Sequence, residues 1–142
     1  MGLKYLLDTN ILSEPVKKLP DQNVLKALDK YAGEYCTCVT VWHELVYGIE
    51  LLDHSKKKDI LSAYLESLVR GGLTVLPYEK TSANWFAKER ARLSKIGIIA
   101  PMADGEIAAI SAANALTLVT RNANDFENFS GLIIENWFTL TP

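Results

Sequence analysis

Five short apolar runs, the first four of them separated by helix-like segments, constrain the fold of this chain more than any other feature. The first run lies only a few residues from the amino terminus, and the runs together are Lys4–Leu7, Tyr35–Val39, Leu73–Leu76, Thr117–Thr120 and Leu132–Ile134. Short continuous apolar runs are typical of strands buried on both faces. Strands that alternate with helices form a parallel sheet with right-handed crossovers. The pattern therefore predicts an α/β fold whose strands end at one common edge.

The length and composition favour a single domain over residues 1–142. The 142 residues are 49% hydrophobic, which is enough for one sizeable core. No run of about 18 apolar residues occurs, as a membrane helix would need, and the amino terminus leads straight into a strand instead of a signal peptide. We therefore expect a cytoplasmic protein.

The segments between the strands carry helix signals. Asp21 can cap a helix after Pro20, and apolar residues follow at helical spacing as far as Tyr31. Residues 41–52, with Thr40 as the expected N-cap, and residues 56–70 are predicted to form a helical hairpin. Two further helices are predicted at residues 81–96 and 102–115.

Acidic residues recur where the predicted strands end. Asp8 directly follows the first strand, and Asp125 lies in the loop after the fourth. Glu44 follows the second strand by about one helical turn, and Asp104 begins the helix that leads into the fourth strand. Ligands of open α/β sheets collect outside the carboxyl ends of the strands. We expect three or four of these acids to meet in one pocket.

The three acids that follow Asp8 in the sequence could each have a purely structural role instead of a role in a site. Glu44 lies on the shoulder of an apolar helix stripe, which points it inward, but a first-turn Glu also interacts favourably with the helix dipole. Asp104 is open to the same helix-end explanation, although small residues on its face favour an inward position. Asp125 stands among turn-forming residues. The individual acids do not decide between these alternatives.

A cluster of carboxylates predicts a particular chemistry. Crowded carboxylates repel one another and raise the pKa of at least one member unless a cation compensates. Mg²⁺ or Mn²⁺ suits a set of oxygen ligands without His or Cys. Such a metal supports hydrolysis of a phosphodiester by activating water and stabilising charge. Thr9, Thr120 and Asn122 are candidates to orient ligands or water.

Four segments carry a family resemblance. In order and spacing, LLDTNILSE, TVWHELVYGI, ADGEIAAISA and LVTRNANDF resemble the four acidic motifs of PIN-domain ribonucleases, above all the VapC-type toxins of type II toxin–antitoxin pairs. The likeness extends from Tyr5 to Trp137. It implies that four acids are the catalytic, metal-binding residues: Asp8, Glu44, Asp104 and Asp125. It also implies that Thr9 and Asn122 occupy supporting polar positions.

The resemblance has further implications for fold and function. It implies a PIN-like three-layer sandwich with a five-stranded parallel sheet of order 3-2-1-4-5. The implied activity is Mg²⁺-dependent (or Mn²⁺-dependent) endonucleolytic cleavage of structured RNA, whether tRNA, rRNA or mRNA. The implied partners are that RNA, a second copy in a homodimer and a small cognate antitoxin. Glu106 lies two residues from Asp104 on a different helix face, so we do not expect it to be a ligand.

Charge and cysteine content add little. The net charge of −2 is not that of a typical nucleic-acid binder, but acids gathered at a metal would leave the remaining surface slightly positive. Some basic residues either are simply solvated or form a rim for RNA phosphates, namely Arg90, Arg92, Lys95 and Arg121. Cys36 and Cys38 are expected to be free, buried thiols, since no recognised zinc spacing joins them to a histidine.

Two other enzyme classes fit the sequence less well than a nuclease. A phosphatase with an aspartyl nucleophile would have a second carboxylate two residues after Asp8, where this chain has Asn10. A dinucleotide-binding enzyme would have a glycine-rich turn at the same place. The serious alternative is a PIN-like module that binds RNA or protein without cleavage, although a decayed site would be expected to have lost one of its acids.

Overall fold

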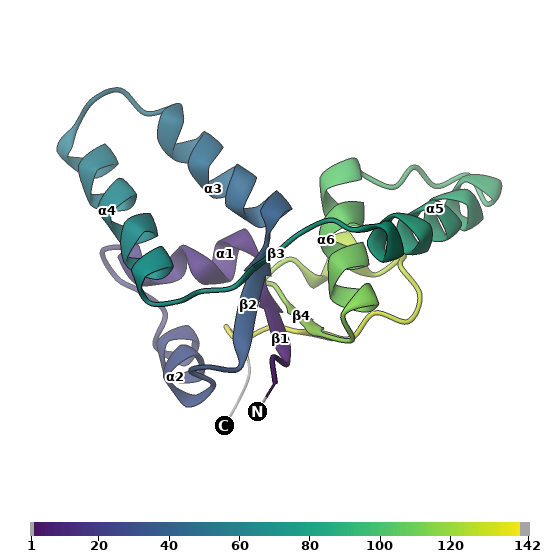
Figure 1. Cartoon of the computed structure of the whole chain (residues 1–142), viewed down its shortest axis with the longest axis horizontal. Helices are drawn as coiled ribbons and strands as arrows, with labels where there is room; N and C mark the ends of the chain where they lie inside the picture. Colours follow the sequence, from purple (N-terminus) through teal and green to yellow (C-terminus); the bar gives the residue numbers. More distant parts are fainter. Residues whose placement is uncertain (1, 140–142) are drawn as a thin grey trace.

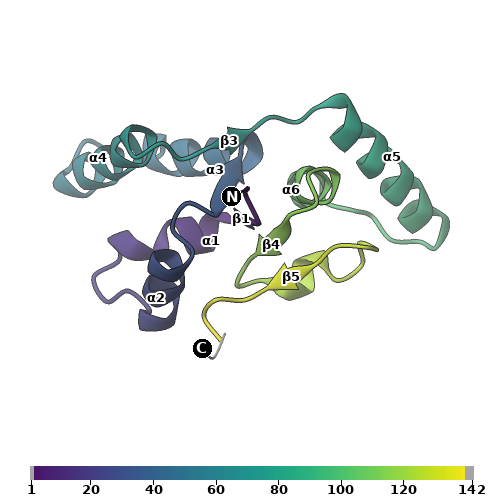
Figure 2. The same ribbon diagram turned by 60° about the horizontal axis from the view of Figure 1, so that its bottom comes forward.

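A five-stranded parallel sheet forms the centre of the computed structural model, which describes residues 2–139. The strands are β1 (Tyr5–Leu7), β2 (Tyr35–Cys38), β3 (Val75–Leu76), β4 (Thr117–Val119) and β5 (Ile134–Glu135). Their order is β3-β2-β1-β4-β5, and all four pairings are parallel. Figure 2 shows β5 at one edge, next to β4. The predicted fold class and strand order are confirmed.

Helices cover both faces of the sheet, so the molecule has three layers (Figure 1). One side carries α1 (Thr9–Leu12), α2 (Gln22–Lys30), α3 (Val39–Glu50) and α4 (Lys56–Arg70). The other side carries α5 (Lys80–Lys95) and α6 (Met102–Ala113). Two 3₁₀ helices, η1 (Glu14–Val16) and η2 (Ala123–Phe126), follow α1 and β4. No helix within residues 2–139 is both long and apolar enough to cross a membrane.

The helix starts follow the capping signals in part. The Asp21 carboxylate accepts hydrogen bonds from the backbone N–H groups of Asn23 and Val24, as predicted for the start of α2. The prediction that Thr40 caps the next helix was wrong. Helix α3 begins two residues earlier than predicted, at Val39 after Cys38, and the Thr40 hydroxyl donates instead to Glu106 on α6 at 3.0 Å.

The core lies between the central strands and the helices. Leu6, Leu7 and Leu118 are completely buried, and so is Trp137 near the carboxyl end. Cys36 and Cys38 are free and buried, as predicted. Burial raises the pKa of the Cys38 thiol to about 11, so this side chain packs as a neutral apolar group.

Helices α5 and α6 approach one another closely because Gly105 has no side chain. A Cβ atom at this position would lie 2.0 Å from the ring of Phe86 on α5. Real Cβ atoms do not approach other atoms so closely, so the ring occupies the space that any other residue would need. Because Gly105 directly follows Asp104, this contact also fixes the start of α6.

Candidate active site

Asp8 lies at the carboxyl end of β1 and is held by three neighbours. Its carboxylate accepts from the Thr120 hydroxyl at 2.7 Å, from the Thr9 backbone N–H at 2.8 Å and from the Asn10 side chain at 3.4 Å. The side chain is almost entirely buried. Burial raises the pKa of Asp8, the charge of Asp125 adds to this, and the three hydrogen bonds oppose it. Asp8 is therefore a fixed carboxylate in an unfavourable place for negative charge.

The polar residues predicted to orient the acids lie next to them, namely Thr9, Thr120 and Asn122. The Thr9 hydroxyl donates to the Glu44 carboxylate at 2.7 Å and so connects the end of β1 to α3. The Thr120 hydroxyl donates to Asp8 and accepts from the backbone N–H of Asn122 at 3.1 Å. Thr9 and Thr120 thus orient acids with their side chains, whereas Asn122 contributes through its backbone.

Asp104, in the first turn of α6, is close enough to the other three acids for their charges to act on it. Burial raises its pKa to about 6, and the charges of Asp125, Asp8 and Glu44 add to the shift. Within residues 2–139 its carboxylate accepts no hydrogen bond from the helix start, so the contacts do not show a helix cap. Asp125 itself is exposed on η2. The four predicted acids therefore face one region.

The spacing and chemistry of these acids bear on a metal. In the described part of the chain, no three Asp, Glu, His or Cys side chains are gathered tightly enough to enclose an ion. Mg²⁺ commonly keeps several waters and is held by only one or two carboxylates together with substrate phosphate. Carboxylates whose charges raise the pKa of Asp8 and Asp104, supported by hydroxyl donors, fit such a hydrated cation.

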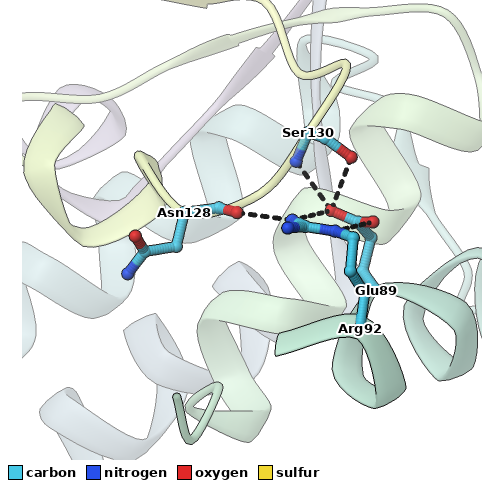
Figure 3. Close-up of polar contacts among 4 residues, drawn as sticks. All are labelled: Glu89, Arg92, Asn128 and Ser130. Carbon is cyan, nitrogen blue, oxygen red and sulfur yellow. Dashed lines mark hydrogen bonds and ion pairs between the residues drawn. The ribbon is translucent and has the colours of Figure 1, made fainter. Parts of the chain in front are cut away.

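An ion pair between buried Glu89 and exposed Arg92 ties the loop after η2 to α5 (Figure 3). The Glu89 carboxylate accepts from the Arg92 guanidinium at 2.9 Å and from the Ser130 backbone N–H at 2.6 Å. Arg92 also donates to the Asn128 carbonyl oxygen at 2.7 Å. Hydrogen bonds from Arg92, followed by those from Ser130, hold the pKa of Glu89 at about 2. This cluster anchors the chain segment that directly follows Asp125.

The predicted basic rim is only partly available. Arg92 is committed to Glu89 and Asn128. The spacing of three residues between Glu89 and Arg92 on one helix was an available signal, whereas Asn128 is distant in sequence. Arg90 and Lys95 are exposed on α5. Arg121 lies with its guanidinium 4.4 Å from the centre of the Phe138 ring. An RNA-binding role for these residues stays a prediction.

Two further polar residues, Asn10 and Glu14, make contacts that were not predicted. The Asn10 side chain donates to Asp8 and accepts from the Arg121 backbone N–H at 2.9 Å, which joins β1 to the loop after β4. Buried Glu14 accepts from Lys17 at 2.9 Å and from the Asp21 backbone N–H at 2.8 Å. Both follow Asp8 closely in sequence, and this proximity was the available signal.

Hollows lie on two sides of the acids. One, of about 490 Å³, is bordered by Glu44, His43, Tyr78 and Glu106. Glu106 thus shares a hollow with Glu44, and its carboxylate accepts from Thr40. The other, of about 390 Å³, is polar and is lined by Arg121, Asn122, Ala123, Asn124, Asp125 and Asn136.

The chain is similar to proteins of one known family along most of its length. The family model described as the PIN domain matches residues 5–132. Ribonuclease VapC2 of Haemophilus influenzae is 34% identical over 135 residues, which cover 95% of this chain and 98% of the relative. The crystal structure of FitAcB from Neisseria gonorrhoeae has a chain with a TM-score of 0.85 and 30% identity, covering 96% of this chain and 99% of that one.

A further solved structure is similar over most of its length. VapBC-5 of Mycobacterium tuberculosis, a member of the VapBC family of toxin–antitoxin systems, has a chain with a TM-score of 0.68 and 25% identity. The match covers 95% of this chain and 96% of that one. These findings agree with the resemblance seen in the four acidic segments.

Proposed function

Because this chain belongs to the PIN-domain family, we propose that it is a metal-dependent endoribonuclease that acts as the toxin of a toxin–antitoxin pair. The observation that carries the proposal is the environment of Asp104. Its pKa is raised to about 6 by burial and by the charges of three other acids, each at a position that the family resemblance marks. Perturbed carboxylates gathered in this way are typical of functional sites.

The chain's own residues supply the frame for hydrolysis of a phosphodiester. A bound Mg²⁺ or Mn²⁺ would supply an activated water and a counter-charge for the reacting phosphate. Asp8 offers a carboxylate that Thr120 and Thr9 hold in place, and Thr9 also holds Glu44. Burial and the neighbouring charges raise the pKa of Asp104 in the metal-free protein, and a bound cation would offset that repulsion. Asp125 completes the negative surface that favours a cation over free phosphate.

The relatives support the choice of substrate and partner. A relative named as a ribonuclease matches almost the whole chain, which supports RNA as the substrate. A toxin–antitoxin complex with the same fold supports a small cognate antitoxin as the partner. Within this proposal the target is a structured RNA such as tRNA, rRNA or mRNA, which implies action in the cytoplasm. Homodimer formation is part of the proposal, and light scattering of the purified chain tests it.

Cleavage of end-labelled total bacterial RNA tests the activity. The purified protein is incubated with Mg²⁺ or Mn²⁺, with EDTA, and as the Asp8→Asn variant. Asp29→Asn is the matched control, because Asp29 is exposed on α2, away from the acids. Discrete fragments that require both the metal and Asp8 are expected. RNA binding without cleavage under every condition would instead support the non-cleaving module.

A further inference from the structure

We propose that the polar hollow beside Asp125 binds one nucleotide of single-stranded RNA, with its phosphate on Arg121 and its base edge on asparagine side chains. This inference rests on the proposed function only in placing that nucleotide next to the bond that is cut. The hollow has a volume of about 390 Å³, within the roughly 300–1,000 Å³ range of small-ligand sites.

Arg121 is held at two points. Its backbone N–H donates to the Asn10 side chain at 2.9 Å, and its guanidinium lies 4.4 Å from the centre of the Phe138 ring. A guanidinium has five N–H donors, and an aromatic ring offers none of them a strong acceptor, so they stay available to a ligand. Within residues 2–139 no carboxylate forms an ion pair with Arg121. An ordered arginine with available donors is suited to bind phosphate through paired hydrogen bonds.

Phe138, on which Arg121 rests, is itself fixed. Its backbone N–H donates to the Asn136 side-chain oxygen at 2.9 Å, and its carbonyl oxygen accepts from Asn23 on α2 at 2.9 Å. The Phe138 side chain also packs against the core, so the ligand does not need to order it. This reduces the conformational entropy that binding would cost.

The asparagines supply hydrogen-bonding groups for a base. The contact to Phe138 uses the side-chain oxygen of Asn136 and leaves its NH₂ group available. The side chains of Asn122 and Asn124 form no hydrogen bond with other residues in the range 2–139. Asparagine can pair with a base edge through both its donor and its acceptor, and single-stranded RNA exposes such edges. The chemistry therefore fits a nucleotide better than a simple anion.

The position of the hollow connects it to the acids. Asp125 forms part of its lining, and the charge of Asp125 raises the pKa of both Asp8 and Asp104. A nucleotide held against Arg121 would thus have its neighbouring phosphodiester beside the four carboxylates. The guanidinium also offsets the repulsion that RNA phosphates would meet there.

RNA binding without turnover tests the proposal. The probe is a fluorescein-labelled, 12-nucleotide RNA of random sequence, and its anisotropy is followed with increasing protein in EDTA at several salt concentrations. Arg121→Gln is expected to weaken binding about fivefold to tenfold and to reduce the salt slope by about 0.7, the value for one phosphate contact on a single strand. Phe138→Leu is expected to weaken binding twofold to threefold. The matched control is Arg70→Gln, which removes an exposed arginine at the end of α4.

Base contact is tested separately with 12-nucleotide homopolymers. Asn124→Ala is expected to change their order of affinity while leaving the salt slope unchanged. The proposal is overturned if Arg121→Gln binds within twofold of the unmodified protein with the same slope, or if the unmodified protein does not bind the probe. An unchanged homopolymer order in Asn124→Ala overturns the assignment of a base.

The result does not depend on cleavage. A loss of affinity in Arg121→Gln with no cleavage by any form would support the subsite and contradict the nuclease. Cleavage by the unmodified protein, with RNA binding unchanged in Arg121→Gln, would support the nuclease and contradict the subsite.

Discussion

Replacing Asp104 with asparagine should stabilise the metal-free protein while removing its function. The pKa of Asp104 is raised from 3.8 to about 6 because the carboxyl group is half-buried and faces three other acids. A carboxyl group with a higher pKa in the folded than in the unfolded chain makes folding less favourable once it ionises. The metal-free protein should therefore lose stability as the pH rises from about 4 to 6, and Asp104→Asn should prevent that loss.

The size of the effect follows from the shift. Without solvent screening, a shift of this size corresponds to about 3 kcal/mol, but a half-exposed group keeps only part of that energy. We expect Asp104→Asn to raise the free energy of unfolding by about 1 kcal/mol at pH 7.5. For a chain of this length this is an increase in melting temperature of roughly 2–4 °C. The gain should shrink as the pH falls towards 4.

Thermal unfolding followed by circular dichroism measures this directly. Both proteins are treated with EDTA and unfolded at pH 4.5 and pH 7.5, with Asp29→Asn as the control for loss of an exposed carboxylate. Adding Mg²⁺ should stabilise the unmodified protein more than the variant. A variant that melts below the unmodified protein in EDTA at pH 7.5, or a gain that is equal at both pH values, would refute the reasoning.

Three further changes test separate contacts. Gly105→Ala should lower the free energy of unfolding by about 1–3 kcal/mol in urea, because the new methyl group meets the Phe86 ring. Adding Phe86→Leu should recover part of that loss. A Gly105→Ala variant as stable as the unmodified protein would contradict the close packing of the two helices. Glu89→Gln should cost about 1 kcal/mol at pH 7. The pKa of Glu89 is lowered to about 2 in the folded protein, so its charge stabilises the fold at any pH above its unfolded pKa near 4.5. The stability lost in Glu89→Gln should therefore shrink as the pH falls towards 2. An equal loss at pH 3 and pH 7 would argue against the ion pair. Thr120→Val should reduce RNA cleavage about 10- to 100-fold across a Mg²⁺ titration, because Asp8 loses its 2.7 Å hydroxyl donor; unchanged cleavage would show that this contact is dispensable.

Local patterns predicted the parallel sheet and pointed to acids at its edge, and the role of those acids stays a prediction. A buried strand followed by Asp8 identifies the edge of the sheet, and helix spacing turns Glu44 inward. The order of the strands came from the family resemblance, because periodicity alone does not say which strands are neighbours.

Contacts between distant residues were beyond local reasoning. Thr40 looks like a cap in sequence, but Glu106, on another helix, offers its hydroxyl an acceptor once α3 and α6 meet. Arg92 looks like a free cation until the loop with Asn128 and Ser130 folds back on α5. Gly105 carries no local signal that the ring of Phe86 needs its space. These pairings depend on tertiary packing, which residue type and spacing do not specify.

The location of a bound divalent cation tests the central claim most directly. Crystals grown with Mn²⁺ and measured for its anomalous scattering would show where the ion binds in the unmodified protein and in Asp8→Asn. We predict a peak among the carboxylates of Asp8, Glu44, Asp104 and Asp125 that disappears in the variant. A peak elsewhere, no peak at all, or one that persists without the Asp8 carboxylate would contradict the proposal that these acids form a catalytic metal site.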